Sequence, residues 1–228
     1  MLRPPLVVVA LAAAAVGCAE PDPAPPPDAV VAADRDTVTA EIAQGTALRA
    51  GDRAPDFALP DAMGRTVRLS ELLVDGPVVL TFYRGAWCPY CNTQLRDYQE
   101  ALAQVEAADA TLVAVSPQTP DGSLTTREKN ALTFPVLSDA GGAVSERYGL
   151  LYQVDRQTRD RYELAGIRLD SVNGADAWEL PVPATYVVDQ TGTIRYAFVE
   201  ADYTQRASAR QVLAALRELA AAGGGPAA

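Results

Sequence analysis

One segment, which runs strand, cysteine pair and helix, constrains the fold of this chain more than any other. The apolar run Pro77–Tyr83 predicts a buried strand, and Cys88 and Cys91 follow after a short loop. From Pro89 to about Ala108, apolar residues recur at helical spacing. We therefore expect Cys88 directly ahead of a helix, where free backbone N–H groups and the helix dipole stabilise an anion.

The two cysteines predict a dithiol redox centre. A thiolate is the reactive form of cysteine, and a helix N-terminus lowers the pKa of a thiol, so we expect the thiolate at Cys88. Cys91, one turn further on, is close enough to form a disulfide with Cys88. A purely structural disulfide is the plainer alternative, but so small a loop removes little chain entropy from the unfolded state.

Composition limits the kinds of functional site that the chain can form. The 228 residues fit one domain plus tails, and a net charge of −10 with scattered arginines gives no footprint for nucleic acid. A structural zinc site needs about four ligands, whereas the chain has no histidine and only one other cysteine, Cys18. We expect neither a metal nor an organic cofactor. Any thiolate must be stabilised by the helix end, by backbone N–H groups or by an arginine, of which Arg84 is nearest in sequence.

The N-terminus predicts export and anchoring. Arg3 precedes an apolar run, Leu6–Val16, that is too short for a typical membrane span. Ala15–Cys18 resembles a bacterial lipoprotein lipobox, although Ala15 stands where leucine is usual. The resemblance implies a signal peptide over 1–17, lipidation of Cys18 and an extracytoplasmic, membrane-anchored protein on the periplasmic face. The alternative is an ordinary secretory peptide in which Cys18 is incidental.

The rest of the chain predicts one folded domain with tails. Residues 18–38 are rich in proline and predict an extended tether, 39–222 predict the domain, and 223–228 a flexible tail. Within the domain, predicted strands alternate with predicted helices, which is typical of an α/β fold with parallel strands. The polar stretch 153–178 interrupts this pattern. We interpret it as an insertion near the mouth of the site, with a helix near Arg156 to Leu164.

Three further segments carry a family resemblance. Gly51–Phe57, Phe134–Asp139 and Pro183–Asp189, together with the strand, cysteine and helix, resemble the peroxiredoxin-like (alkyl hydroperoxide reductase / thiol-specific antioxidant) family over about 48–219. The resemblance implies a thioredoxin-like fold, with a central mixed β-sheet flanked by helices. It also implies a peroxidase in which Cys88 attacks the hydroperoxide and Cys91 resolves the product into a disulfide.

The sequence departs from that family at two places. Typical members carry a threonine or serine three residues before the reactive cysteine, where this chain has Gly85, and the loop ahead of Cys88 looks about three residues short. Typical members also carry an arginine ahead of the strand that faces the cysteine, where this chain has Pro183. Arg147 and Arg168 are candidate substitutes for that arginine.

The cysteine motif itself resembles thioredoxin and glutaredoxin. Trp87-Cys88 matches the first and Cys88-Pro89-Tyr90-Cys91 the second, while Val182-Pro183 resembles the cis-proline segment that faces the cysteines in that superfamily. We therefore expect a cis bond that brings the backbone of Val182 and Pro183 beside the sulfurs. An ordinary trans proline at a strand start is the alternative. Trp87 would contact a partner or only pack, and Arg84 would bind an acidic substrate or only be solvated.

Two functions follow. The first is a thiol-dependent peroxidase of peroxiredoxin-like type, and the second is a thiol–disulfide reductase that acts on extracytoplasmic proteins. A copper-delivery protein is a third possibility, but such proteins usually need a histidine beside the cysteines. Either enzyme would need a thioredoxin-like or membrane-spanning thiol donor of electrons, since an extracytoplasmic site has no direct access to cytosolic reductant.

Overall fold

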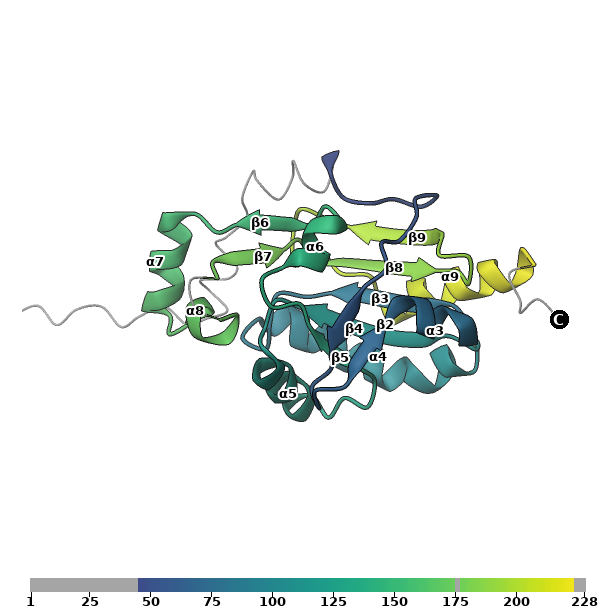
Figure 1. Ribbon diagram of the computed structural model, residues 1–228, viewed down its shortest axis with the longest axis horizontal. Helices are drawn as coiled ribbons and strands as arrows, with labels where there is room; N and C mark the ends of the chain where they lie inside the picture. The colour runs from purple at the N-terminus through teal and green to yellow at the C-terminus, as the bar shows by residue number, and fades with distance from the viewer. Residues whose placement is uncertain (1–44, 175–176, 224–228) are drawn as a thin grey trace, which may run out of the picture.

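The computed structural model describes residues 45–174 and 177–223, and its centre is a five-stranded sheet with the strand order β5-β4-β3-β8-β9 (Figure 1). The strands are β3 (Val78–Phe82), β4 (Thr111–Ser116), β5 (Val136–Ser138), β8 (Ala184–Val188) and β9 (Ile194–Val199). β3, β4 and β5 run parallel, whereas β8 pairs antiparallel with both β3 and β9. The sheet is therefore mixed, as expected. Every residue of β3 is buried, which explains why its sequence reads as a continuous apolar run.

Helices cover both faces of the sheet. Successive side chains of β3 point to opposite faces, so Val79 joins one core cluster while Val78 and Leu80 join the other. The first cluster is closed by α4 (Pro89–Glu106) and α9 (Ala209–Ala221), and it contains both described cysteines. The second is closed by α3 (Leu69–Asp75) and α6 (Ala143–Arg147).

Three smaller elements complete the edge of the sheet near β5. β1 (Ala58–Pro60) and β2 (Thr66–Arg68) form an antiparallel pair, joined to the sheet by a bridge between Asp61 and Leu137. α5 (Pro120–Lys129) packs nearby. Its start is fixed by Thr119, whose side chain accepts a hydrogen bond from the N–H of Gly122.

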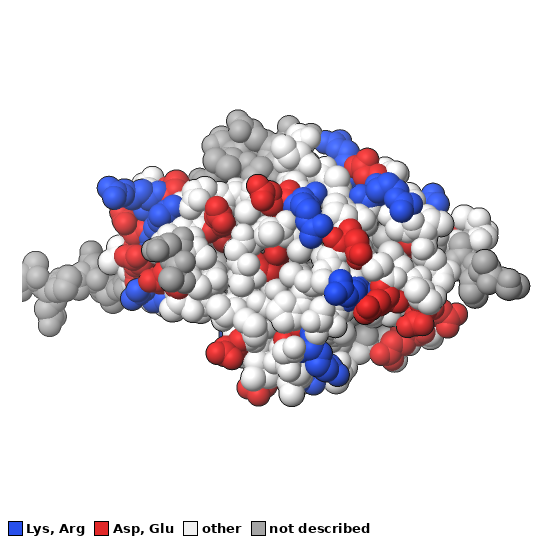
Figure 2. All heavy atoms as spheres, viewed as in Figure 1, with Lys and Arg blue, Asp and Glu red and all other residues white. Residues whose placement is uncertain are grey.

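The insertion predicted over 153–178 is a small layer of its own. It consists of the antiparallel pair β6 (Leu151–Gln153) and β7 (Glu179–Pro181) with α7 (Arg156–Leu164) and α8 (Leu169–Val172) between them. The helix predicted near 156–164 is confirmed, whereas β6, β7 and α8 were not predicted. In Figure 1, α7 and α8 lie at the end of the molecule opposite the C-terminal helix. Acidic and basic side chains are interspersed over the visible face, including this end (Figure 2).

The predicted signal peptide, Cys18 and the tether lie outside the described residues. Within residues 45–174 and 177–223, no helix has both the length and the apolar character needed to cross a membrane.

Candidate functional site

Cys88 stands at the start of α4, as predicted. Its backbone is extended (φ −84°, ψ 117°), its carbonyl accepts the N–H of Asn92 at 3.1 Å, and Pro89 occupies the first helical turn, where its missing N–H is not needed. Cys91 lies inside that first turn and points into the core cluster between α4 and the sheet. Both cysteines are free thiols.

The loop before Cys88 is held rigidly. Gly85 has φ +149°, and a Cβ built there would lie 2.5 Å from Nε1 of Trp87, so only glycine fits. The N–H of Ala86 donates to Oε1 of Gln118 at 2.9 Å, and the carbonyl of Ala86 accepts the side-chain amide of Asn92 at 2.8 Å. These contacts tie the loop to α4 and to the segment after β4, so the positions of the two sulfurs are fixed.

The insertion packs against the loop that precedes the cysteine pair. Cys88 and Cys91 are each 0% exposed, and the ring of Trp87 packs against Tyr162 of α7 with 5.3 Å between centroids. Tyr90, between the cysteines, packs against Tyr203 at 6.0 Å. The expectation that 153–178 lies near the mouth of the site is confirmed at Tyr162, which belongs to the insertion.

Arg84 is a buried cation in a cage of aromatic rings, not a solvated loop residue. It is 0% exposed, and its guanidinium lies 4.3 Å from the ring centroid of Tyr203 and 5.1 Å from that of Trp87. It also donates a hydrogen bond to the hydroxyl of Tyr162. Such stacking keeps a guanidinium tolerable inside the protein and leaves its positive charge next to the cysteines.

Hydrogen-bond donors converge on Cys91. Burial alone raises the pKa of this thiol, but the S–H of Cys88 donates to it, and Arg206 and Arg84 add positive charge, so the pKa of Cys91 is lowered to about 5. Nη2 of Arg206 lies 3.6 Å from its Sγ, and the backbone N–H of Arg84 also donates to it. The structure thus stabilises a thiolate at the second cysteine of the motif.

The thiolate predicted at Cys88 is therefore wrong for this structure. Burial raises the pKa of Cys88, and its hydrogen bond to Cys91 together with the negative charge there raises it further, despite the nearby positive charges of Arg84 and Arg206. The helix start alone does not decide which sulfur ionises. When two close sulfurs share one proton, the negative charge stays on the sulfur that receives more hydrogen bonds.

The predicted cis bond is also wrong. No cis peptide bond occurs among the described residues, so Val182-Pro183 is trans. Proline at this point enters β8, where no ladder hydrogen bond is needed from it. The N–H of Val182 donates to the carbonyl of Leu150 at 2.8 Å, and its side chain belongs to the core cluster on the other face of the sheet. Nothing in this arrangement supports a substrate-binding role for Val182 or Pro183.

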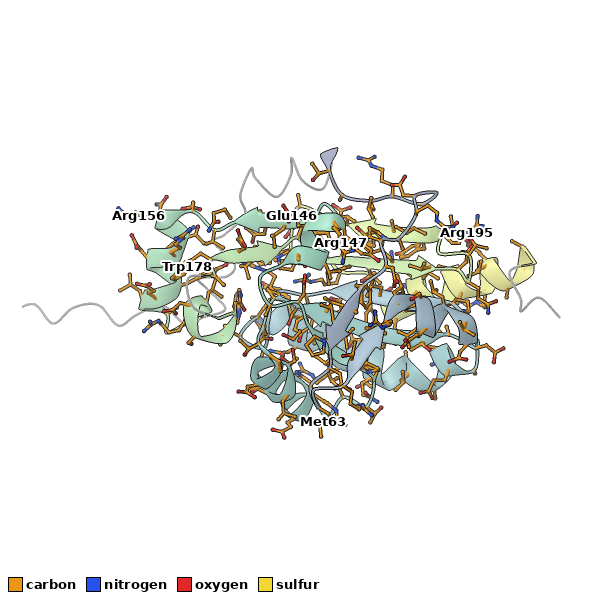
Figure 3. All side chains as sticks on the ribbon, viewed as in Figure 1. Met63, Glu146, Arg147, Arg156, Trp178 and Arg195 are labelled. Atoms are coloured by element: carbon orange, nitrogen blue, oxygen red, sulfur yellow. The ribbon has the colours of Figure 1, made fainter. Side chains whose placement is uncertain are left out.

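The two arginines considered as substitutes lie away from the sulfurs. Arg147 is on α6 (Figure 3), where Nη1 donates to the carbonyl of Asp56 at 2.7 Å. Arg168 pairs with Asp170 at 2.7 Å on the surface of the insertion. The arginine beside Cys91 is Arg206, which the sequence analysis missed. No motif marks it, and its place just before the closing helix is the only signal that could have drawn attention to it.

Near the cysteines, the described residues offer a buried tyrosine but no metal ligand set. Burial raises the pKa of Tyr83 to about 12, so this tyrosine stays neutral at ordinary pH. In the part of the chain that the structure describes, no cluster of cysteine and carboxylate side chains could hold a metal ion. The chemistry that remains is that of a dithiol with one stabilised thiolate.

Comparisons with known proteins identify a family and relatives of this chain. Residues 50–197 match the model of the AhpC/TSA family. A Mycobacterium tuberculosis protein described as a peroxiredoxin is 38% identical over 104 residues, covering 46% of this chain and 66% of its own. Peroxiredoxin Bcp of Escherichia coli is 34% identical over 104 residues, covering 45% and 65%. The matched segment thus spans slightly less than two thirds of these relatives.

Solved structures share the fold. Peroxidoxin BcpB from Mycobacterium tuberculosis superposes with a TM-score of 0.59 at 27% identity, covering 75% of this chain and 98% of that one. A peroxiredoxin-like protein from Aquifex aeolicus gives 0.60 at 20% identity, covering 77% and 90%. The mixed sheet flanked by helices is therefore the thioredoxin-like fold of peroxiredoxins. Because the family model matches more than half of the chain, this protein belongs to the AhpC/TSA family.

Proposed function

We propose that this protein is a thiol-dependent peroxidase that reduces hydroperoxides with the Cys88–Cys91 dithiol. The observation that carries the proposal is the pair of reduced sulfurs one helical turn apart, with one thiolate stabilised by two guanidiniums. A thiolate attacks a peroxide oxygen, and a second thiol close by then closes a disulfide. Membership of the AhpC/TSA family supports the same reaction.

The burial of both sulfurs favours a small oxidant over a protein substrate. Both sulfurs are fully buried, and the ring of the neighbouring Trp87 packs against Tyr162 of α7. A hydroperoxide needs only a narrow opening, whereas a protein disulfide must bring a bulky backbone against the attacking sulfur. The alternative, a thioredoxin- or glutaredoxin-like reductase of extracytoplasmic protein disulfides, rests on the motif Cys88-Pro89-Tyr90-Cys91 at a helix start.

A rate comparison tests the two functions. Reduced protein is mixed with stoichiometric hydroperoxide or with a protein disulfide, and free thiols are counted over time. We expect rapid formation of one Cys88–Cys91 disulfide per hydroperoxide, with no consumption by the double variant Cys88→Ser/Cys91→Ser. A hydroperoxide rate no faster than that of a free thiol, beside rapid disulfide exchange, would replace the peroxidase with the reductase.

We further propose that the protein works at the periplasmic face of a bacterial membrane, anchored through lipid on Cys18. The support is the apolar run Leu6–Val16 followed by Gly17-Cys18. At that place a thioredoxin-like partner or a membrane-spanning thiol donor would return the disulfide to the dithiol. Mass spectrometry of the mature N-terminus tests the anchor, and an unmodified Cys18 or an intact leader would contradict it.

A further inference from the structure

Arg206 directs its guanidinium at Cys91. It lies in the loop between β9 and α9, with Nη2 3.6 Å from Sγ of Cys91. Its Nε and Nη1 are buried and make no hydrogen bond within the described residues. No described carboxylate pairs with it either. In this setting, the thiolate of Cys91 is the anion that this guanidinium faces.

The loop that carries Arg206 is fixed against the helix that carries the cysteines. The hydroxyl of Tyr98 on α4 donates to the carbonyl of Ala207 at 2.9 Å, and Ala207 is buried. Ser208 then begins α9 with a capping box in which its side chain and that of Gln211 bond to each other's backbone N–H. Arg206 therefore keeps its place relative to Cys91 without depending on a flexible segment.

Cys88 differs from Cys91 in what it contributes. The hydrogen bond between the two sulfurs raises the pKa of Cys88 and lowers that of Cys91, which favours the proton on Cys88 and the charge on Cys91. The backbone N–H of Arg84 adds another donor to Cys91. The arrangement is thus directional, with a thiol, an amide and a guanidinium all directed at one sulfur.

We infer that Arg206 is a positioning residue that fixes the negative charge on Cys91, and that Cys91 rather than Cys88 attacks the oxidant. This inference rests on the proposed function only for the identity of the oxidant. The assignment of the attacking sulfur follows from the contacts of the two cysteines. It reverses the order of Cys88 and Cys91 that we expected from the sequence.

The reaction sequence is balanced with the groups present. The thiolate of Cys91 attacks the outer oxygen of the hydroperoxide, so an S–O bond forms, the O–O bond breaks and an alkoxide leaves. The S–H of Cys88 gives its proton to the alkoxide, which becomes the alcohol. The Cys88 thiolate then attacks the sulfenic sulfur of Cys91, which forms the disulfide and releases hydroxide, protonated to water. The dithiol loses two electrons and the hydroperoxide gains them.

The attacking sulfur can be identified without any peroxide. Wild-type reduced protein is treated with limiting iodoacetamide at pH 6, and the modified cysteine is mapped by mass spectrometry. We expect carbamidomethylation at Cys91, since only a thiolate reacts at this pH. Preferential modification of Cys88 would overturn the assignment, whether or not the protein proves to be a peroxidase.

A pH profile isolates the contribution of Arg206. The alkylation rate of Cys91 is measured against pH in wild type, Arg206→Gln, Arg206→Lys and the control Arg210→Gln, which removes an exposed charge on the first turn of α9. The midpoint should rise by about one pH unit or more in Arg206→Gln and by less in Arg206→Lys. It should not move in Arg210→Gln. An unchanged midpoint in Arg206→Gln would overturn the role of Arg206.

Reaction with hydroperoxide is a separate test of which cysteine attacks. In Cys88→Ser, one equivalent of hydroperoxide should leave a sulfenic acid at Cys91 that dimedone traps, while Cys91→Ser should give no such adduct at Cys88. If neither variant reacts with hydroperoxide but the wild-type label still maps to Cys91, the peroxidase proposal fails and the assignment of the attacking sulfur stands. A dimedone adduct on Cys88 formed at the wild-type rate would overturn that assignment.

Discussion

Cys88 and Cys91 lie one helical turn apart, yet they have opposite protonation. The helix start favours an anion at Cys88, but this effect is worth only about 0.3–1 kcal/mol at most helix ends. Cys91 instead receives a thiol, a backbone N–H and a guanidinium. Charge-assisted hydrogen bonds are roughly twice as strong as neutral ones. The sulfur with more donors therefore carries the charge.

The low pKa of Cys91 predicts a pH-dependent stability of the reduced protein. Its pKa is about 5 in the folded state and about 8.5 in an unfolded chain. Because the folded-state pKa is depressed, the stabilisation is complete above the unfolded value and is lost as pH falls through about 5. Between these values the free energy of unfolding should rise with pH, with a slope of up to about 1.4 kcal/mol per pH unit.

Urea unfolding of the reduced protein between pH 5 and pH 8 measures this slope. Cys91→Ser serves as the matched variant, since serine does not ionise in this range and keeps a similar volume. We expect a clearly smaller slope in Cys91→Ser than in wild type. Equal slopes would mean that Cys91 does not lose its proton on folding.

Arg84 offers a separate test of charge against packing. Arg84→Met removes the buried cation and fills a similar volume, so stability should change little, because a buried charge carries a large desolvation penalty. Arg84→Ala should lose about 2–5 kcal/mol of stability through the cavity it leaves. Both variants should raise the alkylation midpoint of Cys91, because both remove the same positive charge. A midpoint that moves only in Arg84→Ala would assign the effect to packing.

The sequence predicted part of this site, but it did not predict which cysteine carries the negative charge. The dithiol, the helix start and the closeness of Arg84 follow from local spacing, and the structure has all three. If Cys88 is taken as the reactive cysteine, the threonine or serine position of the family, three residues earlier, falls on Gly85. If Cys91 is taken instead, that position falls on Cys88, whose thiol can donate a hydrogen bond as the family's hydroxyl does, and the loop is no longer three residues short. Arg206 comes from a distant loop, and no local pattern ties it to Cys91.

At the scale of elements, long periodic segments were predictable and short paired ones were not. α4 and β3 carry their own apolar pattern, so their bounds were predicted within a few residues. β6 and β7 are three residues each and exist only because they pair with each other across the insertion. Such short strands have no alternation to detect. The contacts of Tyr162 in the insertion with Trp87 and Arg84 could therefore not be predicted from these strands.

The packing of the insertion against the loop before Cys88 predicts how reagents gain access to the cysteines. Tyr162 of α7 contacts Trp87 and Arg84, so Tyr162→Ala should loosen the packing around the loop that leads to Cys88. The reaction of the reduced thiols with a bulky reagent such as a dithiobis-nitrobenzoate should accelerate about tenfold, whereas that with small iodoacetamide should change less. Leu164→Ala, an exposed position on the same helix, is the control and should leave both rates unchanged. Equal acceleration of both reagents would indicate unfolding rather than opening.

At the scale of the whole molecule, the redox state of two sulfurs is coupled to the packing of distant segments. The charged environment of Cys91 draws on the loop after β3, on the loop before α9 and, through Tyr162, on the insertion. When the dithiol becomes a disulfide, the guanidiniums of Arg84 and Arg206 no longer face a thiolate. A buried cation that loses its counter-charge is costly, by several kcal/mol in unrelaxed settings. Oxidation should therefore loosen the contacts that bury them.

This coupling predicts that the reduced protein is more stable than the oxidised one, the opposite of the usual effect of a disulfide. The midpoint of thermal unfolding at pH 7 should be higher with a dithiol than after stoichiometric oxidation, and hydrogen exchange should increase on oxidation around α7 and residues 203–208. By thermodynamic linkage, stabilisation of the thiolate in the reduced state raises the reduction potential of the pair. Arg206→Gln should reduce the difference in thermal unfolding midpoint between the reduced and the oxidised protein, because it removes a contact that stabilises only the reduced form. An oxidised form that melts above the reduced form in both proteins would show that the guanidiniums do not link redox state to packing.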